Sequence, residues 1–231
     1  MIFVISDLHL SFGSSKPMDI FNGWENYVPQ LKENWNKTVS KNDTVVIVGD
    51  ISWSMNLSEA KKDFEFINEL QGQKIILKGN HDFWWSSTKK IQTFFQDNCF
   101  ETIKILQNSA ILLENKYVCG ARGWKCKSEN EHDIKIIKRE AERLKLSLDS
   151  AKDKKLEKIV FMHFPPVYGN DSNELMNILI ENKIKLCYYG HVHGRLAAKK
   201  AVVGNYKGVN LQFVSCDYLG FCPKAVTFTP S

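Results

Sequence analysis

The sequence KIILKGNHD, residues 74–82, sets three polar side chains directly behind a short apolar run. The run Lys74–Leu77 is nearly continuous in apolar residues, a pattern typical of a strand buried on both faces. After a glycine come an amide, an imidazole and a carboxylate, namely Asn80, His81 and Asp82. Because such side chains bind metals or substrates, we ask whether the other strands end in the same way.

Four more runs that are short, apolar and rich in β-branched residues predict buried strands: Ile2–Ile5, Thr44–Val48, Ile159–Met162 and Leu186–Tyr189. Apolar residues at helical spacing lie between several of them. In the middle of the chain, residues 102–106, 109–113 and 117–120 instead read as consecutive strands of a meander. This mixture favours an α/β fold in which two packed β-sheets form a sandwich flanked by helices.

A longer amphipathic helix is expected over residues 128–152. Its apolar stripe consists of Ile134, Ile137, Ala141, Leu144, Leu148 and Ala151, and charged residues fill its other faces. Such a helix either flanks a sheet or forms a lid over a site. Since no linker divides the chain, the sequence predicts a single domain over residues 1–231.

The composition is that of an ordinary globular protein, with 43% hydrophobic and 25% charged residues. The net charge of +5 fits a phosphate-bearing substrate, although a lysine-rich surface has the same effect. The six cysteines contain no C-x-x-C pair, which argues against a zinc ribbon or a disulfide framework. Without a signal-type segment or a membrane-spanning run, we expect a cytoplasmic protein with no membrane partner. The sequence predicts no oligomeric state.

Five of the six histidines lie where predicted strands end; only His132 stands apart, in the long polar helix. In an α/β sheet the carboxyl ends of the strands border one crevice. So many polar groups cannot stay unpaired there, and metal ions are the simplest partners. The strand-end residues are Asp7, His9, Asp50, Asn80, His81, Asp82, His163, His191 and His193.

The chain carries an ordered set of motifs: D-x-H (7–9), G-D (49–50), G-N-H-D (79–82), a lone His163 and G-H-x-H (190–193). This set resembles that of the calcineurin-like metallophosphoesterases. The compact chain resembles the small bacterial-type predicted phosphohydrolases of that family. The resemblance implies the two-sheet fold and two metal ions. One ion would be held by Asp7, His9 and His193, the other by Asn80, His163 and His191, with Asp50 bridging them. Imidazole and carboxylate ligands without thiolate suit manganese, iron or zinc.

The same resemblance implies a dinuclear, metal-dependent phosphoric ester hydrolase. A metal-bridging hydroxide would attack phosphorus in line. His81 would protonate the leaving oxygen or stabilise charge there, and Asp82 would hold the other nitrogen of that imidazole. The expected substrates are small phosphodiesters, nucleotides or phosphomonoesters. The residues Ile51-Ser52-Trp53 and Asp82 depart from the protein-phosphatase branch, so a phosphoprotein is a poor candidate.

Two kinds of side chain are expected to contact the substrate. Arg122 and Arg195 are two of only four arginines, and an arginine fork matches phosphate oxygens. The tryptophans Trp53, Trp84 and Trp124 follow motifs or a strand end. They form either a hydrophobic wall beneath the loops or a stacking surface for a base or an aromatic leaving group.

Two other functions stay open on the sequence alone. A nuclease would bind nucleic acid through positive charge, but no basic stripe interleaved with aromatic residues is present. A non-catalytic scaffold with the same fold would be expected to lose metal ligands, and every signature position is filled. A nucleic-acid partner is therefore open but not favoured, and a small phosphorylated substrate is preferred.

Overall fold

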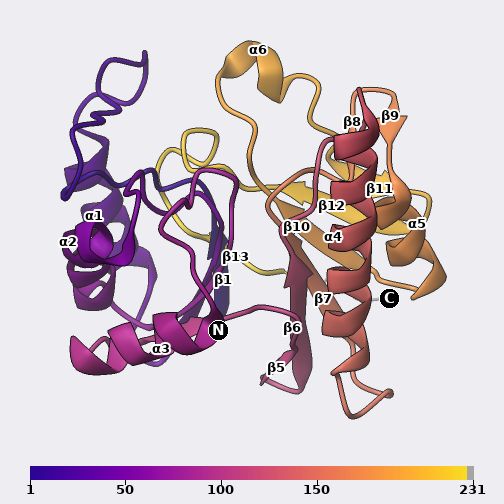
Figure 1. The fold of residues 1–231 in the computed structure, drawn as a ribbon, viewed down its shortest axis with the longest axis horizontal. Coiled ribbons are helices and arrows are strands. Elements are labelled where there is room, and N and C mark those ends of the chain that lie inside the picture. Colours follow the sequence, from indigo (N-terminus) through magenta and orange to yellow (C-terminus); the bar gives the residue numbers. More distant parts are fainter. Residues whose placement is uncertain (228–231) are drawn as a thin grey trace.

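Two β-sheets pack face to face in the computed structural model, which describes residues 1–227 (Figure 1). Helices cover the outer face of each sheet, so that the layers run helix, sheet, sheet, helix. The first sheet has the strand order β13-β1-β2-β3-β4, and the second has the order β11-β12-β10-β7-β6-β5. The mixed α/β sandwich expected from the sequence is confirmed.

The first sheet contains three of the predicted strands at its centre. Its members are β1 (Ile2–Ile5), β2 (Thr44–Val48), β3 (Gln73–Leu77), β4 (Ile103–Ile105) and β13 (Lys224–Ala225). Strands β1 to β4 are parallel neighbours, and Val48 at the end of β2 lies opposite Leu77 at the end of β3. The loops that follow these strands therefore leave the sheet at one edge.

The second sheet repeats this arrangement. Its parallel strands are β6 (Lys116–Ala121), β7 (Lys158–Met162), β10 (Leu186–Tyr189) and β12 (Val209–Phe213), and its antiparallel edges are β5 (Ile111–Leu113) and β11 (Gly204–Tyr206). A small hairpin, β8 (Val167–Tyr168) and β9 (Asp171–Ser172), follows β7. The carboxyl edges of the two sheets meet where Ser6, just after β1, pairs with Ser215, just after β12.

Alternating side chains divide the core into layers. On β1, Ile2 and Val4 point between the sheets, whereas Phe3 points to the helices. Between the sheets, the rings of Phe161 and Tyr188 stack at 5.4 Å. The outer helices are α1 (Tyr27–Thr38), α2 (Leu57–Glu69) and α3 (Thr88–Asp97) on one side, and α4 (Glu131–Asp149) and α5 (Glu174–Glu181) on the other (Figure 1). Burial of both sheet faces explains the continuous hydrophobicity of the predicted strands.

Two details differ from the expectation. Residues 102–106 do not begin a meander, because β4 pairs with β3 in the first sheet and only β5 and β6 form a hairpin. The long helix α4 packs against β6 and α5, so it is a flanking helix rather than a lid. In its first turns Ile136 is buried, whereas Ile134, which was expected in the apolar stripe, is 44% exposed.

A short helix, α6 (Arg195–Ala198), lies beyond the carboxyl ends of the strands of the second sheet (Figure 1). No helix within residues 1–227 combines the length and the apolar character needed to cross a lipid bilayer. The single-domain prediction for residues 1–231 stays a prediction, and residues 228–231 lie outside the described part of the chain.

Candidate metal centre

The loops after five parallel strands bring the predicted ligands to the joined edges of the two sheets. These residues follow β1 (Asp7, His9), β2 (Asp50), β3 (Asn80), β7 (His163) and β10 (His191, His193). Backbone hydrogen bonds tie neighbouring loops together. The N–H of Asp7 donates to the carbonyl of Gly49 at 2.9 Å, and the N–H of Gly190 donates to the carbonyl of His163 at 3.1 Å.

Four of these residues have a left-handed backbone, with φ of 64° at Asp7, 46° at His9, 49° at Asp50 and 74° at His191. For residues with a side chain this conformation costs about 1–3 kcal/mol each, and it persists only where the surrounding structure enforces it. Here the buried strand that precedes each loop supplies that constraint. Such clustered strain is typical of a functional site.

Two glycines allow the loops to approach one another. A Cβ on Gly79 would lie 2.1 Å from Oδ1 of Asp50, and a Cβ on Gly190 would lie 2.4 Å from Oδ2 of Asp7. Both distances are far below van der Waals contact, so no other residue fits without moving a carboxylate. The glycines of G-N-H-D and G-H-x-H are thus required by the packing of the ligand loops.

Asp7, His9 and His193 form the first candidate ligand group. Nε2 of His193 lies 3.3 Å from Oδ1 of Asp7 and 3.2 Å from Nε2 of His9. Two ligand atoms that each lie about 2.1 Å from a tetrahedrally coordinated ion are about 3.4 Å apart. The spacing of this group therefore fits a single ion between the three side chains.

Asp50, His163 and His191 form the second group. Nε2 of His163 lies 3.4 Å from Oδ2 of Asp50 and 3.3 Å from Nδ1 of His191. The carbonyl oxygen of Asn80 lies 2.8 Å from the same Nε2, so the amide joins this group. Oδ2 of Asp50 is also 3.8 Å from Nε2 of His9, which sets this one oxygen between the two groups.

Both groups attract positive charge. Burial alone would lower the pKa of His163 and His193, but neighbouring carboxylates outweigh it and raise the pKa to about 9 for His163 and about 10 for His193. Burial lowers the pKa of His9 to about 4 and the pKa of His191 to about 3. Each group thus pairs one imidazole that favours a proton with one neutral imidazole. A divalent ion fits the same demand and would displace the proton.

Outer hydrogen bonds orient two of these imidazoles. Nδ1 of His163 lies 3.0 Å from the carbonyl oxygen of Val48, and Nδ1 of His193 lies 3.2 Å from Oδ1 of Asp217. Asp217 also accepts a hydrogen bond from the N–H of Gly194 at 2.9 Å. A ring that donates from Nδ1 presents the lone pair of Nε2 to an ion. Asp217 was missed in the sequence analysis, although it closely follows β12.

Asp82 is placed differently from the role that the resemblance implied. Its buried carboxylate accepts hydrogen bonds from the backbone N–H groups of Ile51 (2.8 Å) and Gly79 (2.7 Å) and from the indole of Trp84 (3.0 Å). Burial and the nearby Asp50 raise the pKa of Asp82 to about 6. Within residues 1–227 no hydrogen bond joins it to the His81 ring, because these donors surround it. Asp82 therefore ties the loop after β2 to the loop after β3.

The three tryptophans have separate environments. Trp84 is only 2% exposed and packs edge-on against Phe64 at 4.8 Å, so of the two expected roles its environment fits the hydrophobic wall and not contact with substrate. Trp53 stacks on His9 at 4.7 Å and lies 4.4 Å from the ring of His81. The half-buried His81 is held by its backbone N–H, which donates to Oδ1 of Asp50 at 2.7 Å.

Arg122 and Trp124 lie beside the second ligand group. The guanidinium of Arg122 is centred 4.8 Å from the Trp124 ring and lies 3.4 Å from Oε1 of the buried Glu140. Arg143 donates to the same oxygen at 2.8 Å. A hollow of about 210 Å³, which we name the basic hollow, is lined by Arg122, Glu140, Arg143 and Lys78. With three cationic side chains around one carboxylate, the basic hollow has a net positive charge.

The backbone carbonyl of Arg122 accepts a hydrogen bond from the N–H of Phe164, the residue after His163, at 2.8 Å. The loop that carries Arg122 is therefore joined to the loop that carries His163, and an arginine fork suits a phosphate oxygen there. Arg195, by contrast, is exposed at the start of α6, and no hydrogen bond or ion pair within residues 1–227 ties its side chain to the centre.

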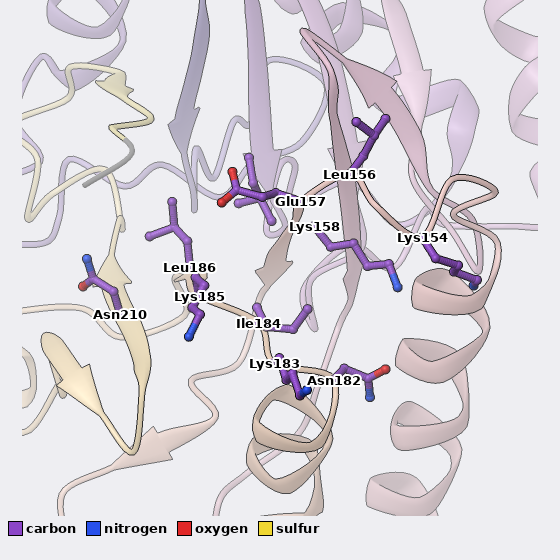
Figure 2. Close-up of a pocket in the computed structure, with 11 residues that line it drawn as sticks. Lys154, Leu156, Glu157, Lys158, Asn182, Lys183, Ile184, Lys185, Leu186 and Asn210 are labelled. Carbon is purple, nitrogen blue, oxygen red and sulfur yellow. The ribbon is translucent and has the colours of Figure 1, made fainter. Parts of the chain in front are cut away.

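A separate hollow of about 300 Å³ lies at the opposite edge of the second sheet, where β7 and β10 begin (Figure 2). Four lysines line it, namely Lys154, Lys158, Lys183 and Lys185. Of the described residues around it, none is a histidine, cysteine or aspartate. This hollow therefore offers positive charge but no set of metal ligands, and the candidate chemistry stays at the carboxyl edge.

The contact between His193 and Asp217 leads to a test. We expect Asp217→Ala to weaken metal binding by about 10–100-fold at the first ligand group and to leave the second unchanged, because the imidazole loses its orienting carboxylate. Metal content after dialysis against buffered metal solutions measures both sites. Asp97→Ala, which removes an exposed carboxylate at the end of α3, is the control. Equal affinities in the two variants would show that Asp217 does not position His193.

Comparison with solved structures identifies the same fold elsewhere. A phosphopantetheinyl hydrolase from Mycobacterium tuberculosis aligns with a TM-score of 0.58 and 14% identity, over 93% of this chain and 88% of that chain. AQ665, a protein of unknown function from Aquifex aeolicus, aligns with a TM-score of 0.55 and 16% identity, over 97% of this chain and 94% of that chain. At these identities the likeness shows the fold alone.

Comparison of sequences identifies the family. The uncharacterized protein MJ1445 of Methanocaldococcus jannaschii is 34% identical over 86 residues, which are 35% of this chain and 46% of that protein. The chain thus matches less than half the length of this curated relative. The family model of the calcineurin-like phosphoesterases matches residues 1–195, a range that includes all seven predicted metal ligands. The chain therefore belongs to the calcineurin-like phosphoesterases, a family of metal-dependent hydrolases.

Proposed function

We propose that the chain hydrolyses a small phosphoester with two divalent metal ions. One observation carries this proposal: two three-residue ligand groups lie side by side and approach each other through Oδ2 of Asp50. One ion would be held by Asp7, His9 and His193. The other would be held by Asn80, His163 and His191, and Asp50 would bridge the two.

The donor set supports manganese, iron or zinc, because it consists of imidazoles, carboxylates and an amide. The nearby thiol of Cys216 donates to the carbonyl of Asp7 at 2.9 Å, and burial raises the pKa of Cys216 well above its usual value. The thiol is thus already engaged with a backbone carbonyl, and it is not part of either ligand group. When bound, the two ions would neutralise charge on the phosphate and lower the pKa of a bound water toward neutrality.

His81 is the residue proposed to act on the leaving oxygen. Its ring lies 5.8 Å from the ring of His9, at the rim of the first ligand group. Burial lowers the pKa of His81, so the ring is neutral at neutral pH and keeps one N–H. That N–H donates a hydrogen bond that stabilises the charge developing on the leaving oxygen as the bond to phosphorus breaks; transfer of a proton to that oxygen would require the ring in its imidazolium form.

The first test is a matrix of substrates and metals. Protein reconstituted with Mn²⁺, Zn²⁺ or Mg²⁺ is assayed with p-nitrophenyl phosphate, bis-p-nitrophenyl phosphate, cyclic nucleotides and dinucleoside polyphosphates, with and without a chelator. We expect two bound ions per chain and hydrolysis that the chelator abolishes. Protein that carries two ions and hydrolyses none of these esters would contradict the proposed reaction, and protein that binds no ion would contradict the proposed centre.

The role of His81 is tested by separating turnover from metal content. His81→Ala should lower kcat by about 10²–10⁴-fold, because the donor to the leaving oxygen is lost, while metal content stays near that of the unmodified chain. His132→Ala, in the exposed first turn of α4, is the control and should change neither quantity. Loss of an ion in His81→Ala would show that His81 is a ligand instead.

Arg122 is proposed to bind a phosphate oxygen from the basic hollow. Arg122→Ala should lower kcat/KM for phosphoesters by about 10–100-fold, because a charge-assisted hydrogen bond contributes about 1.5–3 kcal/mol. Arg139→Ala is a matched control, since this exposed arginine lies 3.7 Å from the same Glu140 but does not line the hollow. Unchanged kinetics with every substrate would remove Arg122 from the site.

We also propose that the protein acts in the cytoplasm. All six cysteines are free, and burial raises the pKa of Cys119 to about 11, that of Cys126 to about 12 and that of Cys187 well above its usual value. Unpaired, unreactive thiols suit a reducing compartment, where disulfides do not persist. Fractionation of the source cells would test this location.

A further inference from the structure

A second hollow borders the candidate centre on the side of His81. It has a volume of about 390 Å³, and three histidines form one wall, namely His9, His81 and His193. The rest of its lining includes the apolar side chains of Met18, Phe21, Trp24 and Trp53, together with Asn22 and Gly194. We name it the apolar hollow. Its volume is that of a pocket for part of a small molecule.

The tryptophans of the apolar hollow offer an occupant little polar surface. The indole N–H of Trp53 donates to the sulfur of Met18 at 3.3 Å, so the one polar group of that ring is already used. Trp24 is 4% exposed and meets the rings of His9 and His193 edge-on, at 5.9 and 5.6 Å. No lysine, arginine, aspartate or glutamate of the described residues lines the hollow. A polar occupant would therefore lose hydrogen bonds to water and find few replacements.

Two other hollows near the centre carry charged side chains. The basic hollow carries Lys78, Arg122 and Arg143. A third hollow, of about 470 Å³, borders His191 and His193, and in it Lys125 and Lys127 lie with Glu129 and Asp171 beside apolar residues. Anionic parts of a substrate have partners in the basic hollow. An apolar part is stabilised beside His81 without a charged neighbour, since burying apolar area is favourable in proportion to that area.

The position of His81 identifies which part of the substrate this is. In an in-line displacement the leaving group departs on the face opposite to the attacking water, and its oxygen takes up a proton as the bond to phosphorus breaks. Because His81 is the proposed donor and forms a wall of the apolar hollow, the group bound there is the leaving group.

We propose that the apolar hollow binds an apolar leaving group, so that the natural substrate is a phosphoester of an aryl or alkyl alcohol rather than of a sugar or a polyol. This inference rests on the proposed function and specifies its substrate class. Trp53 and Met18 are the specificity residues, since they form a joined side-chain pair that faces His81 from outside the metal ligands.

The test uses three methylphosphonate esters that cannot be hydrolysed readily and differ only in the ester group: butyl, phenyl and 2,3-dihydroxypropyl. Their inhibition constants are measured against the best substrate of the metal-loaded protein. We expect the butyl and phenyl esters to bind at least about tenfold more tightly than the dihydroxypropyl ester, since even one methylene in a fitted pocket contributes about 10-fold or more. Which of the butyl and phenyl esters has the lower inhibition constant shows whether the hollow prefers an alkyl or an aryl leaving group.

Substitutions in the apolar hollow test whether its residues cause the preference for apolar esters. In Trp53→Ala and in Met18→Ala the ratio of the butyl to the dihydroxypropyl inhibition constant should fall to about twofold, and Lys125→Ala, in the third hollow, should keep the full ratio. Because both constants come from one protein sample, changes in folding or metal content cancel. Equal inhibition by the three esters, or no inhibition, in a chain that hydrolyses phosphoesters would overturn this inference alone. A chain that hydrolyses no phosphoester would overturn the proposed function instead.

Discussion

The carboxylate of Asp7 joins the two sheets, and the geometry of the centre depends on that junction. Asp7 follows β1 in the first sheet, yet its Oδ2 accepts hydrogen bonds from the hydroxyl of Ser215 (2.8 Å) and from the N–H of His191 (3.0 Å), which follow strands of the second. Gly190 permits this approach, since a Cβ there would overlap the carboxylate. The sheets therefore cannot slide apart without exposing a buried charge, and the loops of both sheets are held in one register.

Positive charge is the second requirement of this junction. Asp7 and Asp50 are both buried, and burial alone would raise the pKa of each, but the imidazoles around them keep both carboxylates ionised. The raised pKa values of His163 and His193 express the same demand for positive charge beside these carboxylates. With ions, the imidazoles of both groups select cations that accept nitrogen ligands, because a hard ion such as Ca²⁺ prefers all-oxygen sites.

The sequence located the side chains that gather at this edge for a physical reason. Every ligand follows a buried strand, and such strands are visible as continuous apolar runs, so Asp7, Asp50 and His163 could be located without coordinates. The partners of these residues could not. Asp217 meets His193 only because β12 lies beside β10. Asp82 was assigned to His81 because the sequence does not show that the N–H of Ile51, in a distant loop, donates to its carboxylate. The hydrophobic pattern of the sequence predicts where each strand ends, but the pairing of strands in the sheets decides which strand ends lie together.

The surroundings of the centre are asymmetric, and this has a consequence for catalysis. Positive charge lies on the side of Arg122, and aromatic and thioether groups lie on the side of His81. A substrate with one anionic end and one apolar end has a single favourable orientation, with its leaving oxygen at the imidazole. Binding free energy from the apolar end then serves to hold the ester in line for attack, which raises turnover rather than affinity alone. An ester with two polar ends would gain no such orientation, even though its phosphate could reach the same ligands.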